Sequence, residues 1–142
     1  TIRAGERVGL VHGKMKPTDK DAVMAAFADP ADAVRAALAI QSAPPEGLAI
    51  KMGLHSGACV AVTLNGRLDY FGSTVNLAAR LEGLSQGGDI VLSDRLASDP
   101  VVSAVISPLH SAVESAELKG FGAPVSFRRL VPDVVNPYTA LS

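Results

Sequence analysis

The order of apolar and polar residues along the chain predicts two amphipathic helices. Apolar side chains recur at three- and four-residue spacing after Asp29-Pro30 and again after Gly72, and this spacing lines one face of a helix. We expect Asp29 to be the N-cap of the first helix and Pro30 to take its first helical position, with Pro44-Pro45 ending it. The residues expected on its inner face are Val34, Ala37, Leu38 and Gln41.

The second helix is expected to start after a turn at Gly72 and to end at a pair of glycines. Ser73 or Thr74 is predicted to cap its N-terminus, because a hydroxyl oxygen there can accept a bond from a free backbone N–H. Gln86-Gly87-Gly88 is predicted to close it with a glycine C-cap. Its apolar stripe consists of Leu77, Ala78, Leu81 and Leu84.

Short apolar segments between turn signals predict the strands of one mixed sheet. Asn65-Gly66 is a strong hairpin signal, and 15–20 reads as another hairpin tip. The segment 1–13 is interpreted as the end of a helix leading into a turn at His12-Gly13, and 93–108 as a short helix with loops. Strands mixed with helices in this order indicate an α+β sandwich. The predicted strands are 22–28, 48–64 (one long strand or a pair), 67–71, 90–92, 113–118 and 125–131.

Composition and charge exclude several classes of protein. A chain of 142 residues with 48% apolar residues suits one globular domain, and a net charge of −1 without a basic patch argues against a nucleic-acid partner. Lys51, His55 and Arg67 interrupt the longest apolar stretches, so we expect no segment of this chain to span a membrane. No signal peptide is recognised, and the single Cys59, interpreted as a small core residue, fits a reducing compartment. We therefore expect a cytoplasmic domain.

Three polar residues around the second helix stand out from this background. Asn76 and Arg80 are four residues apart, so they share one helix face and lie one turn apart. Asp69 precedes Asn76 by seven residues, on the strand side of the turn. Taken singly, each would be an ordinary exposed polar residue. Together they bring a carboxylate, an amide and a guanidinium to one region, which indicates a functional site.

The segment that carries these residues resembles a known signature. Asp69-Tyr-Phe-Gly-Ser-Thr-Val-Asn-Leu-Ala-Ala-Arg-Leu-Glu82 is similar to the signature helix of class III nucleotidyl cyclases, the adenylate and guanylate cyclases. The resemblance runs from about Lys16 to Val131 and implies a ferredoxin-like βαββαβ core, of which we expect the first strand to be missing. We expect an N-terminally incomplete cyclase catalytic domain at 1–131 and a C-terminal tail at 132–142. Further matching segments are 21–27, 51–57, 88–93 and 117–120.

The resemblance implies a role for each candidate residue. Arg80 would stabilise the charge that develops on the α-phosphate when the ribose 3′ oxygen attacks it, and Asn76 would orient the ribose. Asp69 would read the base with Lys16, and an aspartate at this position goes with adenine in the family, so ATP is favoured over GTP. Asp21 would be the second of two aspartates that hold two Mg²⁺ or Mn²⁺ ions per site.

The same resemblance implies partners for the domain. In the family the metal aspartates come from one protomer, and the base-reading pair, the asparagine and the arginine come from the other. We therefore expect a homodimer with its sites at the interface. Cyclase domains are usually joined to sensor or membrane segments, so an upstream sensor domain is a further candidate partner.

The chain also departs from the family pattern. The segment 1–14 holds only Glu6 as a carboxylate, so we find no counterpart of the first metal aspartate. Lys20 stands where the family has a glycine, and Lys16 lies five residues before Asp21 instead of four. The family's late phosphate-binding lysine would fall at Phe121. From the missing aspartate we expect little or no turnover by this chain alone.

Two functions follow from these observations. The first is an adenylate cyclase that converts ATP to 3′,5′-cyclic AMP and pyrophosphate in intracellular signalling. The alternative is a catalytically impaired cyclase-like domain that dimerises or holds a nucleotide as a regulatory module. A guanylate cyclase is disfavoured by Asp69, and an unrelated ferredoxin-like interaction domain by the number of coinciding motifs. Of the remaining polar residues, His55 is interpreted as a packed strand histidine and Gly87-Gly88-Asp89 as a turn.

Overall fold

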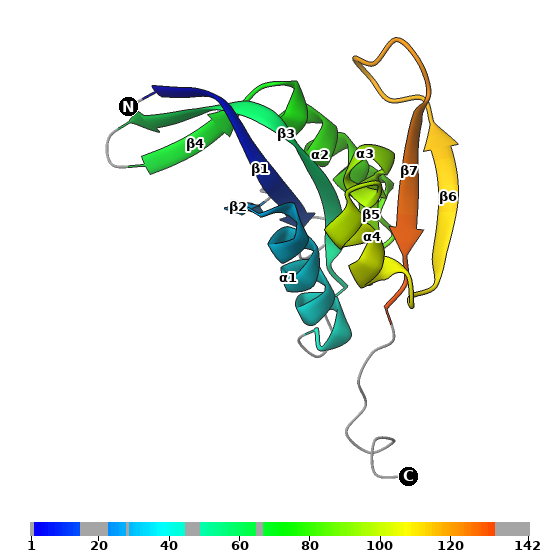
Figure 1. Ribbon diagram of the computed structural model, residues 1–142. Coiled ribbons are helices and arrows are strands. Elements are labelled where there is room, and N and C mark those ends of the chain that lie inside the picture. Colours follow the sequence, from blue (N-terminus) through cyan, green and yellow to red (C-terminus); the bar gives the residue numbers. More distant parts are fainter. Residues whose placement is uncertain (1, 15–22, 28, 45–48, 65–66, 133–142) are drawn as a thin grey trace.

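The computed structural model describes residues 2–14, 23–27, 29–44, 49–64 and 67–132. They form a seven-stranded mixed sheet in the order β2-β1-β3-β5-β7-β6, with β4 paired to β3 (Figure 1). The α+β class predicted from the sequence is confirmed. The elements are β1 (Ile2–Lys14), β2 (Val23–Phe27), α1 (Pro30–Ser42), β3 (Lys51–Leu64), β4 (Arg67–Phe71), α2 (Ser73–Leu84), β5 (Ile90–Ser93), α3 (Asp94–Ala97), α4 (Pro100–Ile106), β6 (Ser111–Ala116) and β7 (Val125–Leu130).

The first described element differs from its prediction. β1 is a strand, so the prediction of a helix end in 1–13 is wrong. A strand also precedes β2, although we expected the first strand of the core to be missing. β1 pairs antiparallel with both β2 and β3, so its backbone groups find partners on two sides. These long-range bonds decide its conformation, and Gly13, expected in a turn, lies opposite Val23 and Met52. The hairpin tip expected at 15–20 lies outside the described residues.

The first helix forms as its sequence predicts. The Asp29 side chain accepts a hydrogen bond of 2.9 Å from the backbone N–H of Ala31, and Pro30 begins α1. Val34, Ala37 and Gln41 are buried, and Leu38 packs at the edge of the same core. This core lies between one face of the sheet and helices α1, α3 and α4, and includes Leu54, Leu92 and Leu130.

The second helix covers the opposite face of the sheet and lies directly on β3. A Cβ added to Gly53 would lie 2.1 Å from the backbone nitrogen of Glu82 and 2.5 Å from the carbonyl oxygen of Ala78. A Cβ added to Gly57 would lie 2.8 Å from Thr74 Oγ1. The two glycines therefore set how closely α2 approaches the sheet. The predicted stripe is confirmed, with Ala78 and Leu81 buried and Leu77 and Leu84 half-buried.

Strand β3 changes its neighbours along its length. Near its start, Gly53 and Leu54 pair in parallel with β5. Its last residues, from Val60 to Leu64, pair antiparallel with β4 instead. Leu64 lies opposite Arg67 on either side of residues 65–66, as the predicted hairpin requires. In Figure 1 this end of β3, with β4, projects away from the helices.

The remaining elements complete the far side of the sheet. The segment 93–108, expected to hold one short helix, contains α3 and α4. Ser93 caps α3 by accepting a bond of 3.2 Å from Leu96, and Asp99 caps α4. The predicted last hairpin is confirmed by the antiparallel pairing of β6 with β7. Within the described ranges, no helix combines the length and the apolar character needed to cross a membrane.

Candidate active site

The turn between β4 and α2 depends on Gly72. Its φ of 127° lies in the region that favours glycine, and it is the N-cap of α2. The Gly72 carbonyl oxygen accepts a hydrogen bond of 3.1 Å from the backbone N–H of Asn76. No side chain caps the helix, so the prediction of a Ser73 or Thr74 cap is wrong, and these residues occupy the first helical positions instead. The glycine turn joins the strand that carries Asp69 directly to the helix.

Asn76 and Arg80 lie on the outer face of α2, as their spacing predicts. Both residues are exposed, one turn apart, opposite the buried Ala78 and Leu81. In the part of the chain that the structure describes, neither side chain has a hydrogen bond or an ion pair. An amide and a guanidinium therefore lie one turn apart on the exposed face of α2.

Of the other three candidate residues, the structure describes only the backbone of Asp69. Asp69 lies on β4, where its backbone is opposite Val62 of β3. Lys16 and Asp21 lie outside the described residues, so the structure does not test whether they approach Arg80.

The described residues do not form a metal centre of their own. Among them, no three His, Cys, Asp or Glu side chains gather where they could hold a metal ion. β1, which pairs with the strand that follows Asp21, contains Glu6 as its single carboxylate residue. The donor set that two divalent ions need is therefore not found in the described part of the chain.

Comparison with known proteins identifies the family. The model of the adenylate and guanylate cyclase catalytic domain matches residues 9–108. The chain belongs to this family. It is thus a nucleotide cyclase domain, of the lyase class, and the resemblance seen in the sequence is confirmed.

Individual relatives refine this result. The cyclase domain is 41% identical to an uncharacterized protein of Mycobacterium tuberculosis over 73 residues, which are 51% of this chain and 28% of that protein. It is 40% identical to an adenylate cyclase of Mycosarcoma maydis over 78 residues, which are 54% of this chain and 3% of that enzyme. The chain therefore spans only a small part of these relatives.

A solved structure supports the fold. An adenylate cyclase from Trypanosoma brucei, determined in its monomeric state, superposes with a TM-score of 0.75 at 18% sequence identity. The superposition covers 92% of this chain and 93% of that one. At this identity the similarity concerns the fold alone, and it confirms the cyclase-type α+β architecture.

His55 lies beneath α2 in the interior of the cyclase domain. It is buried, and its Nδ1 is 2.5 Å from the Oγ of Ser93 on the neighbouring strand β5. Burial, and secondarily the positive charge of Arg95, lower the pKa of His55 to about 4. The imidazole is therefore neutral near pH 7 and packed in the sheet, which agrees with its interpretation as a packed strand histidine.

Acid is expected to destabilise the cyclase domain through His55. The unfolded chain binds a proton near pH 6.5, whereas the folded chain binds it only near pH 4, so acid favours unfolding between these values. The neutral His55 makes its full contribution to the free energy of unfolding above pH 6.5. Lowering the pH to 4 should reduce the free energy of unfolding by about 3 kcal/mol. Urea unfolding at a series of pH values measures this slope. His55→Gln should flatten it, and equal slopes in both proteins would contradict the prediction.

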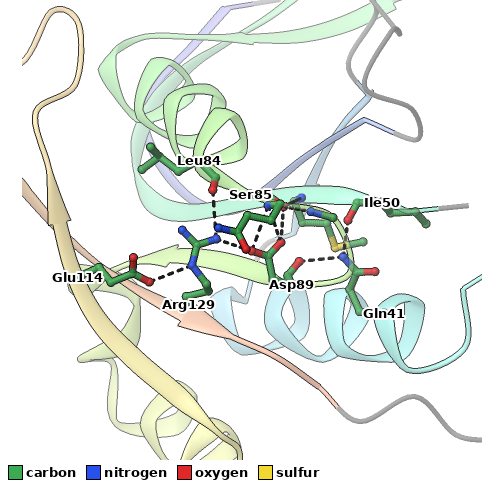
Figure 2. A network of polar contacts seen from close by, with 10 residues as sticks. Gln41, Ile50, Leu84, Ser85, Asp89, Glu114 and Arg129 are labelled. Atoms are coloured by element: carbon green, nitrogen blue, oxygen red, sulfur yellow. Dashed lines mark hydrogen bonds and ion pairs between the residues drawn. The ribbon is translucent and has the colours of Figure 1, made fainter.

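A polar network below the C-terminus of α2 was not predicted. The helix ends at Leu84 with Ser85 as its C-cap, so the expected glycine C-cap is wrong. Gly87 and Gly88, with φ of 92° and 79°, form a turn that brings Asp89 back beneath the helix. Asp89 is buried and forms an ion pair with Arg129 of β7 (Figure 2). The sequence contains one local signal for this network, which is an acidic residue directly after two glycines. The partner of this residue, Arg129, lies 40 residues further along the chain, so the local pattern does not reveal the ion pair.

Proposed function

We propose that this cyclase domain converts ATP to 3′,5′-cyclic AMP and pyrophosphate. The observation that carries the proposal is the exposed pair Asn76 and Arg80, one turn apart on α2 and without side-chain partners among the described residues. The similarity to an adenylate cyclase of Mycosarcoma maydis supports it.

The proposed chemistry assigns a role to each of these two side chains. The ribose 3′ oxygen forms a bond to the α-phosphorus, its proton is released, and the bond from that phosphorus to the pyrophosphate breaks. Negative charge builds on the α-phosphate oxygens during this exchange, and the paired N–H donors of Arg80 would stabilise it. The Asn76 amide would hold the ribose for attack. Asp21 is the proposed ligand for Mg²⁺ or Mn²⁺, which when bound would offset the negative charge of the triphosphate.

We also propose that the domain acts as a homodimer. The exposed face of α2 carries Asn76 and Arg80 but, within the described residues, no group of carboxylates able to hold a metal lies with them. A second copy related by a two-fold axis would bring its own Asp21 to this face, and the same contact would form twice. Each dimer would then contain two shared sites.

The base preference is tested by assaying the full-length protein with Mn²⁺ and with ATP or GTP, while both cyclic products are measured. We expect cyclic AMP from ATP and little product from GTP, because an Asp69 carboxylate with Lys16 complements the amino group and ring nitrogen of adenine. Asp69→Asn should lower kcat/KM for ATP about 10–100-fold, the loss expected for a hydrogen bond to a charged group. Preferential use of GTP by the unsubstituted protein would contradict the proposal.

A second function remains supported by a specific observation. β1 lies between β2 and β3 in the sheet and contains only Glu6 as a carboxylate residue, and the described residues contain no cluster of three His, Cys, Asp or Glu side chains that could hold a metal ion. A domain of this kind could bind a nucleotide and dimerise without turnover. The same assay separates the two functions, since nucleotide binding by a folded dimer without any cyclic product would favour the regulatory module.

A further inference from the structure

The C-terminal end of α2 is held by a residue from a distant strand. The last carbonyl groups of a helix have no partners within it, and a positive charge there is favourable. α2 has no basic residue in its own last turn. Arg129 of β7 supplies one, because its Nη1 donates a hydrogen bond of 3.1 Å to the carbonyl oxygen of Leu84 (Figure 2).

The Arg129 guanidinium is itself held on two sides. Its Nη1 pairs with Asp89 Oδ2, and its Nε donates a bond of 2.9 Å to Glu114 Oε2 on β6. The side chains of Arg129 and Asp89 are 15% and 6% exposed, so these charged bonds are shielded from water. Burial alone would lower the pKa of Arg129, but the bonds to Glu114 and Asp89 outweigh it and raise the pKa, which keeps the group charged.

Asp89 extends the connection to the chain that follows the helix. Its carboxylate accepts bonds from Ser85 Oγ at 2.5 Å and from the backbone N–H of Gln86 at 3.1 Å. Ser85 Oγ in turn accepts a bond from the backbone N–H of Met52 on β3. The end of α2 is thus joined through one network to β7 and to β3, on both sides of β5.

From this arrangement we propose that Arg129 is a positioning residue for the nucleotide site. By fixing Leu84 it sets the direction of α2, and therefore the places of Arg80 and Asn76, which lie one and two turns earlier on the helix. This inference rests on the function proposed above. Placement of this kind matters for rate, since a displacement of about 1 Å at a reacting group can cost on the order of 10²-fold.

Substitutions at two neighbouring residues separate positioning from simple stabilisation. Arg129→Gln removes the charge from the helix end, whereas Arg129→Lys keeps it with fewer donors. Glu114→Gln is the matched control, because the Glu114 carboxylate accepts a bond from the guanidinium but none from α2 within the described ranges, and its side chain is 39% exposed. If Arg129 only stabilised the fold, Arg129→Gln and Glu114→Gln should show the same kcat and the same amide exchange in α2 once each protein is folded.

The test combines amide hydrogen exchange with steady-state kinetics on the full-length protein. Arg129→Gln should speed exchange in 73–84 but not in 30–42, and should lower kcat for ATP about 10-fold with KM changed less than about 3-fold. Arg129→Lys should recover part of kcat, and Glu114→Gln should stay close to the unsubstituted protein. Unchanged exchange in 73–84, or an unchanged kcat, would overturn the inference.

The two arms also distinguish this inference from the proposed function. If the unsubstituted protein makes no cyclic nucleotide, the proposed function fails, but the exchange arm still decides whether Arg129 fixes α2. Faster exchange confined to 73–84 then supports the placement of the helix, and uniform exchange overturns it. If Arg129→Gln does not fold, Arg129→Lys takes its place and Glu114→Gln remains the control. Faster exchange in 73–84 and a lower kcat in Arg129→Lys than in Glu114→Gln would support the inference, and equal values would overturn it.

Discussion

Replacing Arg80 by alanine is expected to lower kcat for cyclic AMP formation at least ~10²-fold, the usual loss when one donor to a developing anion is removed. The folded state should hardly change, because Arg80 is exposed and its side chain has no partner among the described residues. Surface substitutions of this kind alter the free energy of unfolding by about 0.5 kcal/mol or less. The measurement is kcat with saturating ATP and Mn²⁺, together with a thermal melt of each protein.

Arg35→Ala is the matched control for this substitution. Arg35 is also an exposed helical arginine, and it pairs with Asp32 at 3.1 Å on α1, away from the proposed site. Exposed pairs of this type contribute little to stability, so the variant should keep both its fold and its kcat. If Arg80→Ala retained more than about a tenth of kcat, Arg80 would not be the group that stabilises the α-phosphate.

Mixing two inactive variants extends the Arg80 experiment to the dimer. A heterodimer of Arg80→Ala with Asp21→Asn has one site in which both residues are intact and one in which both are lost. Half of the dimers in an equal mixture are heterodimers, so about a quarter of the activity should return. Activity that stays at the level of the separate variants would show that the site is not shared between two copies.

Gly53→Ala is expected to lower the free energy of unfolding by about 4 kcal/mol, above the usual 1–3 kcal/mol for overfilling a core. The added Cβ would lie 2.1 Å from the backbone nitrogen of Glu82 and 2.5 Å from the carbonyl oxygen of Ala78. Both obstacles are helix backbone, so no side-chain rotation relieves the contact, and α2 as a whole must move from β3. Urea unfolding monitored by circular dichroism measures the change.

Gly83→Ala provides the opposite expectation within the same helix. A Cβ added to Gly83 meets no atom within 4 Å, and alanine is the better helix former by about 1 kcal/mol. This variant should therefore be slightly more stable than the unsubstituted protein. A loss below about 1 kcal/mol for Gly53→Ala would mean that α2 lies further from the sheet than the structure places it.

Features with a local physical cause could be predicted from the sequence. Asp29 and Pro30 start α1 through a side-chain cap and a fixed φ, both of which depend on adjacent residues. The stripe of α2 and the hairpin of β6 with β7 follow from spacing and turn residues. The exposed pair Asn76 and Arg80 belongs to this class, because its geometry comes from one helix turn.

Features that depend on distant partners could not be predicted. β1 is a strand because β2 and β3 lie on both sides of it, and its own residues show no clear period. The end of α2 is set by Ser85 and by contacts with Asp89 and Arg129, instead of the glycines that the local pattern favoured. The roles of Lys16 and Asp21 stay predictions, since both residues lie outside the described ranges.

The change of neighbours along β3 has an evolutionary consequence. In the proposed site the residue that reads the base, Asp69, belongs to the projecting ribbon of β3 and β4, whereas Asn76 and Arg80 belong to a helix packed on the central sheet. β4 pairs with β3 outside the main order of strands, so we expect substitutions in it to disturb the central core less than substitutions in α2 or β5. We therefore expect the nucleotide preference to change during evolution through substitutions in the ribbon. The residues of α2 that act on the phosphate could stay the same while the preferred purine changes.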